Sequence, residues 1–218
     1  MVHLYVAEIR NLPEPMQCKD IISLFPLERQ EKIKNCVRVE AKMQCFATGL
    51  LLEYVFQKYG LKTQDIKKGA FGKPEADGIY FNLSHSDGLV LCVVGDKKVG
   101  CDVEAVKEAP KRLAERFFSV GEQQYLLQFR GKLYDEQFFR VWTAKESYIK
   151  MTGEGMHLPM QAYEINLAHE ITVYRDEIMQ ECSLKEYRRD EYQITVCSED
   201  TVFSEEIQVV DLSKEFEI

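Results

Sequence analysis

The 218-residue sequence has no long hydrophobic run. A helix needs roughly 20 consecutive apolar residues to cross a membrane, and no stretch approaches that length. The first eight residues read as a strand and lack the basic start and apolar block of a signal peptide. We therefore expect a cytoplasmic protein that has no membrane partner.

The seven cysteines form no CxxC pair and no Cys/His cluster with the spacing of a zinc site. An odd, scattered set is typical of reduced thiols in a cytosolic protein. Cys101 lies next to Asp102 and near Glu104, but on a strand it points away from both. We expect it to be a small buried hydrophobe rather than a nucleophile.

Positive charge is also scarce, because 28 Lys and Arg face 36 Asp and Glu and the net charge is −8. Nucleic-acid-binding proteins generally carry a basic stripe, so no nucleic-acid partner is expected. The four histidines form no arrangement with a nucleophile and an acid, which argues against a Ser/His hydrolase. A phosphate-bearing ligand remains compatible with the charge, since local lysines and a metal would bind it.

Hydrophobic periodicity and turn residues predict a mixture of helices and short strands. The predicted helices cover residues 18–25, 27–59 with a break near the middle, 111–117, 119–129 and 134–151. The predicted strands cover residues 1–10, 79–84, 89–95, 99–104, 162–167, 171–175, 192–197 and 206–210. Most connections between strands are short, which favours antiparallel pairing and the α+β class.

Residues 100–104 read Gly-Cys-Asp-Val-Glu and follow an apolar run and a turn, so they are predicted as the second strand of a hairpin. Asp102 and Glu104 then project from the same face. Two such carboxylates repel each other unless a cation lies between them, and Mg²⁺ takes oxygen ligands that it shares with substrate phosphates. The alternative is an exposed strand face, although acidic residues are depleted in strands.

A second acidic position lies in the predicted helix of residues 134–151, where Glu146 and Lys150 are four residues apart. An ordinary surface pair has this spacing and contributes only about 0.3–0.5 kcal/mol. Trp142, the only tryptophan, lies on the same helical face. A face with this composition suits the wall of a cleft, which makes Glu146 a candidate third carboxylate.

Several other polar residues have an ordinary interpretation as solvated charges or turn residues and a functional one as phosphate contacts. They are Lys73 in a loop rich in Gly and Pro, Ser84 and His85 at a strand end, and Arg29 and Lys32 on a helix.

Five blocks of sequence resemble motifs of the phosphopantetheinyl transferase superfamily, and in particular its long, monomeric type. They occur in the family's order and spacing at residues 71–74, 81–86, 100–104, 116–119 and 142–150. The core of the resemblance covers roughly residues 70–165, and a looser match extends to the first long helix.

The resemblance implies an enzyme that moves the phosphopantetheine arm of coenzyme A to a serine of an acyl or peptidyl carrier protein and releases 3′,5′-ADP. It implies two similar α/β subdomains, here residues 1–105 and 106–218, related by pseudo-twofold symmetry. Coenzyme A would lie in the cleft between them, and the chain would act as a monomer.

The resemblance also assigns roles to residues of this chain. Asp102, Glu104 and Glu146 fall on the metal positions, for which Mn²⁺ is as suitable as Mg²⁺. The other carry-overs are the contacts to coenzyme A: Arg29, Lys32, Lys73, Ser84, His85, Asp102 and Lys150. The chemistry of the transfer makes Glu146, as proton acceptor, and Lys150, as stabilising charge, the candidate catalytic residues.

One departure concerns residues 42–49, where the family commonly carries a basic residue just before the glycine of the first long helix. Here Thr48 precedes Gly49, and Lys42 is the alternative cation for the 3′-phosphate of coenzyme A.

Two other functions fit the same residues. One is a different Mg²⁺-dependent phosphotransferase or nucleotide hydrolase, which would not require a carrier protein. The other is a binding module without catalysis, which would have little need of the carboxylates. The sequence leaves open which carrier protein would be served.

Overall fold

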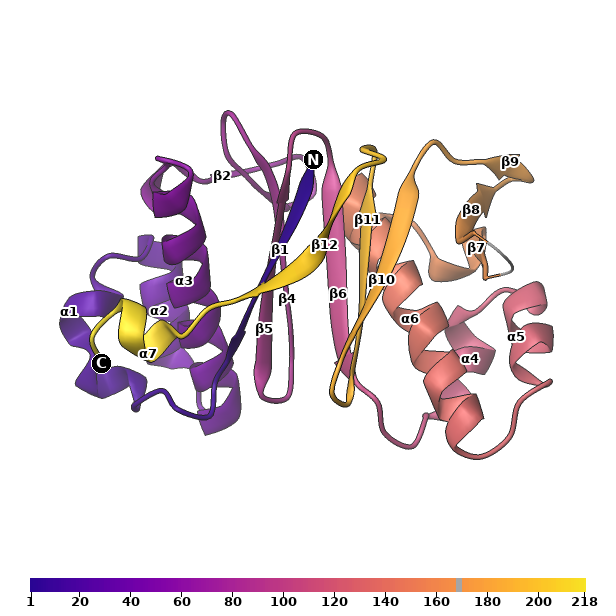
Figure 1. Ribbon diagram of the computed structural model, residues 1–218, viewed down its shortest axis with the longest axis horizontal. Coiled ribbons are helices and arrows are strands. Elements are labelled where there is room, and N and C mark those ends of the chain that lie inside the picture. The colour runs from indigo at the N-terminus through magenta and orange to yellow at the C-terminus, as the bar shows by residue number, and fades with distance from the viewer. Residues whose placement is uncertain (168–169) are drawn as a thin grey trace.

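The computed structural model describes residues 1–167 and 170–218. Two sheets lie in the middle of the molecule, with helices on both outer sides (Figure 1). This architecture confirms the predicted α+β class. The helices on one side are α1 (Lys19–Ile22), α2 (Leu27–Asn35), α3 (Val39–Lys58) and α7 (Leu212–Glu215), and those on the other are α4 (Lys111–Phe117), α5 (Val120–Leu126) and α6 (Lys132–Thr152).

The first central sheet has the strand order β12 (Phe203–Val209), β1 (Val2–Glu8), β5 (Leu89–Gly95), β4 (Tyr80–Ser86). The second has the order β10 (Ser183–Arg189), β11 (Tyr192–Ser198), β6 (Val99–Ala105). Two small sheets complete the fold, β2 (Lys67–Lys68) with β3 (Pro74–Glu75), and β7 (Tyr163–Asn166) with β8 (Thr172–Arg175) and β9 (Ile178–Met179). These pairings are antiparallel except for β1 with β12, which is parallel.

Each half of the molecule places one long helix on one central sheet. Helix α3 packs on β5 and β1, and α6 packs on β6 and β11. A buried apolar layer that includes Leu4, Leu91 and Val103 fills the space between the two sheets. Because side chains alternate along a strand, Asp102 and Glu104 leave this layer and face α6. The twofold relation between the halves stays a prediction.

The predicted break in the first long helical segment is confirmed, since α2 ends at Asn35 and α3 begins at Val39. The predicted hairpin of residues 89–95 and 99–104 is wrong. Strand β5 pairs with β1 and β4, whereas β6 pairs with β11. A strand has two hydrogen-bonding edges, and both edges of β5 are occupied, so the chain crosses to the second sheet after the turn.

Sequence periodicity missed strand β10 and helix α7. Strand β10 is an edge strand whose only buried residue is Tyr187, so it lacks the apolar alternation that identifies a strand. The division after residue 105 stays a prediction. Strand pairing crosses it twice, through β6 with β11 and through β12 with β1. Among the described residues, no helix is both long enough and apolar enough to span a membrane.

Close contact between β6 and α6 depends on Gly100. A Cβ atom at this position would collide with the helix backbone at Ser147, Lys150 and Met151. Backbone atoms of a packed helix cannot move aside as the end of a flexible side chain does. Glycine therefore sets the separation at which α6 presents its side chains to β6.

We predict that Gly100→Ala lowers the free energy of unfolding by about 2–3 kcal/mol, because the added methyl group overpacks a helix–strand contact. Urea denaturation followed by circular dichroism measures this change. The matched control is Gly88→Ala, where a Cβ would meet only the Tyr192 hydroxyl at 3.5 Å. We expect the control within about 0.5 kcal/mol of the wild type. Equal stability of the two variants would contradict the prediction.

Candidate active site

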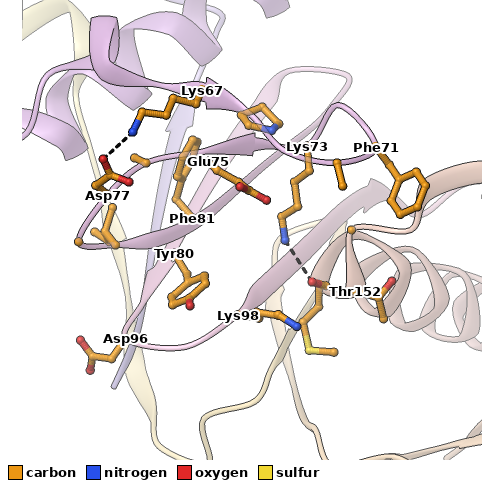
Figure 2. A pocket seen from close by; sticks show the side chains of 17 residues that line it. Lys67, Phe71, Lys73, Glu75, Asp77, Tyr80, Phe81, Asp96, Lys98 and Thr152 are labelled. Carbon is orange, nitrogen blue, oxygen red and sulfur yellow. Dashed lines mark hydrogen bonds and ion pairs between the residues drawn. The ribbon is translucent and has the colours of Figure 1, made fainter.

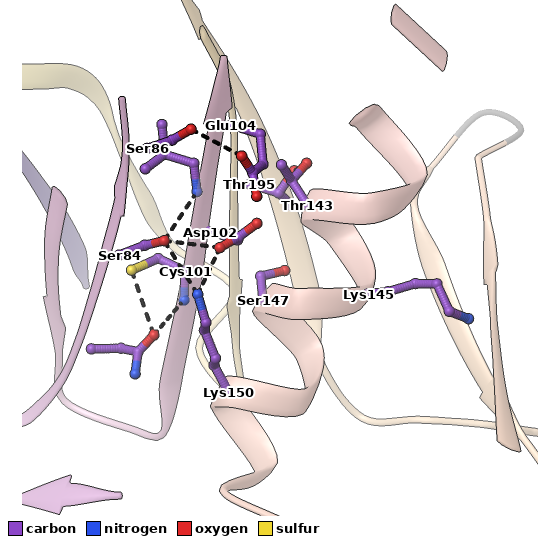
Figure 3. Close-up of polar contacts among 12 residues, drawn as sticks. Ser84, Ser86, Cys101, Asp102, Glu104, Thr143, Lys145, Ser147, Lys150 and Thr195 are labelled. Carbon is purple, nitrogen blue, oxygen red and sulfur yellow. Dashed lines mark hydrogen bonds and ion pairs between the residues drawn. The ribbon is translucent and has the colours of Figure 1, made fainter. Parts of the chain in front are cut away.

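The candidate site lies where β4 meets β6, and the two strands are joined there by side chains of β4 (Figure 3). Alternate β6 amide groups point toward β4, while the intervening residues pair with β11. Three side chains accept these N–H donors: Asn82 from Cys101 at 2.9 Å, Ser84 from Val103 at 3.4 Å, and Ser86 from Ala105 at 3.1 Å. The seam between the two sheets is therefore polar.

Asp102 lies at the centre of this seam and is only 4% exposed. Its Oδ1 accepts hydrogen bonds from Lys150 Nζ at 2.6 Å and from Ser84 Oγ at 2.8 Å. Its Oδ2 is buried and has no hydrogen-bond partner among the described residues. A buried carboxylate oxygen without a partner is costly, so this atom marks a place for a further cation or donor.

Lys150 reaches Asp102 from α6 and also donates to Ser84 Oγ at 3.2 Å. Burial is the largest single influence on the pKa of Lys150 and lowers it, but Asp102, Cys101 and Glu146 together outweigh burial, and the pKa is raised. Lys150 therefore stays a cation over the physiological pH range.

Glu104 and Glu146 add negative charge around Asp102. Glu104 Oε2 accepts from Ser86 Oγ at 2.9 Å. Burial and then the charge of Asp102 raise the pKa of Glu104 to about 7. The same two causes raise the pKa of Glu146, which Lys150 partly offsets. The three carboxylates thus lie close enough to influence one another, and the nearby positive charge is too small to cancel the rise in the pKa of Glu104 and of Glu146.

The donor set of this environment suits a hard divalent cation. Carboxylate oxygens are the ligands that Mg²⁺ and Mn²⁺ prefer, and the unpartnered Asp102 oxygen is available. Across residues 1–167 and 170–218, however, no three Asp, Glu, His or Cys side chains are already arranged to hold a metal ion. The metal ligands predicted from the sequence stay a prediction.

A cavity of about 620 Å³ borders the site. Lys73 and Asn82 line it from the N-terminal half, and Trp142, Glu146 and Lys150 line it from α6. The Trp142 ring also packs against Phe117 and Phe138 with centroid distances of 5.9 Å. The helix face singled out from the sequence is therefore the wall of a cleft.

Lys73 also lines a neighbouring cavity of about 590 Å³ (Figure 2). Its Nζ donates to the carbonyl of Val99 at 2.9 Å and to that of Met151 at 3.2 Å. Burial lowers the pKa of Lys73. The structure thus places this lysine beside the cleft, with its ammonium group on backbone carbonyls of β6 and α6.

The remaining cations predicted from the sequence lie on the α3 side. Arg29 is half-buried, and its Nη1 donates to the Cys45 carbonyl at 3.2 Å. Lys32 is exposed. Burial, then Lys150 and Lys32, lower the pKa of His85, so His85 shares an electrostatic field with both lysines. A phosphate role for Arg29, Lys32 and His85 stays a prediction.

The expectation for Cys101 is confirmed. Its side chain is completely buried, and burial raises the pKa of the thiol to about 12. A thiol with this pKa is not a nucleophile at neutral pH.

Sequence reasoning missed the roles of Asn82 and Ser86 and a buried ion pair beside the site. Lys145 and Glu122 are at most 1% exposed, with Lys145 Nζ 2.7 Å from Glu122 Oε1. Lys145 points away from Lys150 on the other side of α6 (Figure 3). Glu122 and Ser119 also form a capping box at the start of α5, and the pattern Ser-x-x-Glu was a usable signal.

Comparison with known proteins shows the family of the chain. The family model described as the 4′-phosphopantetheinyl transferase superfamily matches residues 98–197. The 4′-phosphopantetheinyl transferase gsp of Aneurinibacillus migulanus is 32% identical over 169 residues, which are 70% of this chain and 71% of that protein. The chain belongs to the 4′-phosphopantetheinyl transferase superfamily.

A second relative covers more of the chain, and a solved structure resembles part of it. The 4′-phosphopantetheinyl transferase Sfp of Bacillus subtilis strain 168 is 30% identical over 201 residues, which are 87% of this chain and 88% of Sfp. A crystal structure of a holo-(acyl-carrier-protein) synthase from Bacillus anthracis, in complex with CoA (3′,5′-ADP), is 18% identical with a TM-score of 0.40. It covers 46% of this chain and 92% of that one.

We predict that Lys145→Met lowers the free energy of unfolding by about 3–5 kcal/mol, because it leaves the Glu122 charge buried and unpaired. Adding Glu122→Gln removes that charge and should restore at least about half of the loss. The control is Lys68→Met, which removes a surface pair with Glu28 and should change stability by no more than about 0.5 kcal/mol. Urea denaturation measures all three variants, and equal losses for Lys145→Met and Lys68→Met would refute the prediction.

Proposed function

We propose that this chain transfers the 4′-phosphopantetheine arm of coenzyme A to a serine hydroxyl of an acyl or peptidyl carrier protein, with release of 3′,5′-ADP. The observation that carries the proposal is the group of Asp102, Glu104, Glu146 and Lys150 at the β4–β6 seam, beside a cleft lined from both halves. Membership in the superfamily supports the same reaction.

Lys150 provides the fixed positive charge of the site. Transfer of a phosphate-linked group builds negative charge on the pyrophosphate of coenzyme A, and a cation already in place stabilises that charge without reorganisation. Asp102 keeps the lysine protonated and holds its ammonium group 2.6 Å from its own Oδ1. Ser84 bonds both residues, which limits the orientation of the pair.

Glu146 is the candidate acceptor for the proton of the carrier serine. It lines the cleft together with Lys150. Burial and the charge of Asp102 raise its pKa toward the range in which a carboxylate acts as a general base at neutral pH.

Asp102, Glu104 and Glu146 would hold Mg²⁺, or Mn²⁺ in its place. The bound ion would neutralise pyrophosphate charge as a Lewis acid. Lys73, Ser84, His85, Arg29 and Lys32 are the proposed contacts to coenzyme A. Lys32 and His85 are the pair best placed for a phosphate, because Lys32 is exposed and near enough to His85 for its charge to lower the pKa of His85.

The carrier protein would dock at the mouth of the cleft. Helix α4 carries Lys111, Arg112 and Arg116 and ends at Phe117, which lines the cleft. Cations of this kind complement an acidic carrier despite the net charge of −8. The proposal further includes that the chain acts as a monomer of two subdomains, residues 1–105 and 106–218. It would act in the cytoplasm and would have no nucleic-acid partner.

The test of the function is the intact mass of a purified apo carrier protein after incubation with this chain, coenzyme A and Mg²⁺. We expect a gain of about 340 Da, the mass of one phosphopantetheine group, that EDTA abolishes. Breakdown of coenzyme A without carrier modification would indicate a hydrolase instead. Binding of coenzyme A with no modification of any of several carriers would indicate a binding module.

We predict that Asp102→Asn reduces the transfer rate by about 1,000-fold, because it removes the carboxylate that holds Lys150 and offers the unpartnered oxygen. Glu146→Gln should also lose most activity at saturating Mg²⁺. The control is Asp190→Asn in the exposed β10–β11 turn, which should retain full activity. Initial rates of carrier modification measure these effects. Near-full turnover of Glu146→Gln with normal metal binding would remove Glu146 from the role of base.

A further inference from the structure

Ser86 makes two hydrogen bonds that together fix the direction in which its hydroxyl proton points. Its Oγ accepts the Ala105 N–H at 3.1 Å and lies 2.9 Å from Glu104 Oε2. A serine hydroxyl has one proton, and an N–H donor cannot receive it, so the proton of Ser86 must point at the carboxylate of Glu104. The side chain is only 7% exposed, which protects this arrangement from competition by water.

The same arrangement occurs two residues earlier on each strand. Ser84 accepts the Val103 N–H and donates to Asp102, as Ser86 accepts the Ala105 N–H and donates to Glu104 (Figure 3). The difference lies in the other partners, because Asp102 also has Lys150 whereas the only hydrogen bond to the Glu104 carboxylate among the described residues comes from Ser86.

Glu104 needs such a restraint. Its side chain has three rotatable bonds, is only partly buried, and projects from the same strand face as Asp102. Repulsion between the two carboxylates favours rotamers in which Glu104 turns away from Asp102. The Ser86 bond opposes this movement and engages only one of the two carboxylate oxygens, Oε2.

We propose that Ser86 is a positioning residue that holds the Glu104 carboxylate beside Asp102 in the orientation required for divalent-metal binding. The inference rests on the proposed function in one respect, namely that Glu104 is a metal ligand. Residues that orient metal ligands in this way typically change metal affinity 10–100-fold when they are removed.

The experiment compares Mn²⁺ binding, followed by electron paramagnetic resonance, with the Mg²⁺ dependence of carrier modification in Ser86→Ala. We expect the Mn²⁺ dissociation constant and the Mg²⁺ concentration for half-maximal rate to rise about 10-fold or more, with the rate at saturating Mg²⁺ within about threefold of the wild type. Ser86→Thr, which keeps the hydroxyl, should restore both values. Ser198→Ala is the control, because Ser198 is a buried serine that likewise accepts one N–H and donates one hydrogen bond, but to the Lys98 carbonyl and away from the carboxylates.

A double-mutant cycle separates positioning from a loss of stability. In a Glu104→Ala background, adding Ser86→Ala should leave Mn²⁺ binding unchanged, because Ser86 acts through Glu104. An equal additional weakening in that background would overturn the proposal, as would wild-type Mn²⁺ binding by Ser86→Ala. Because Mn²⁺ binding needs no carrier, a chain that modifies no carrier but shows this cycle would refute the proposed function and retain the inference.

Discussion

Strand β6 pairs through its backbone with β11 in one sheet, and its other N–H groups donate to side chains of β4 in the other sheet. The arrangement of the site depends on this double attachment of β6. Its odd-numbered amides, at Cys101, Val103 and Ala105, would be buried without partners if β4 carried apolar residues at the seam. Polar residues on β4 satisfy them, and two of these are serines whose protons remain available for β6 carboxylates. One requirement, the pairing of buried backbone donors, thereby places acidic side chains at the junction of the two halves.

The charge at this junction is unbalanced within the described residues. Lys150 pairs with Asp102, and it only partly offsets the effects that raise the pKa of Glu104 and of Glu146. The same shortage of positive charge and donors leaves Asp102 Oδ2 without a hydrogen-bond partner among the described residues. A buried charge on the other side of α6 does have its counter-charge, since Lys145 pairs with Glu122. An incompletely satisfied group at one place in an otherwise satisfied fold is the pattern expected of a ligand site.

Sequence reasoning was most reliable where a pattern acts locally. Local patterns predicted three features that the structure confirms: the break between α2 and α3, the face shared by Asp102 and Glu104, and the burial of Cys101. It failed where the result depends on competition between distant segments. The turn after β5 predicts a hairpin, but β1 and β4 already occupy both edges of β5. Strand β10 forms because β11 offers it an edge, which its own polar sequence does not reveal.

The site illustrates the same limit. Asp102, Glu104, Glu146 and Lys150 stand out in the sequence because of their charge and spacing. Ser86 ends the block of residues 81–86, three residues before the start of β5, and there it resembles any turn serine. Its importance comes from the register between β4 and β6, which exists only in the folded chain. The low exposure of Asp102 and the partial burial of Glu104 carry a cost in the free protein, since each charge is removed from water without a full set of partners. A cation that binds the folded state would offset that cost, so the same features that cost free energy in the protein alone would make cation binding favourable.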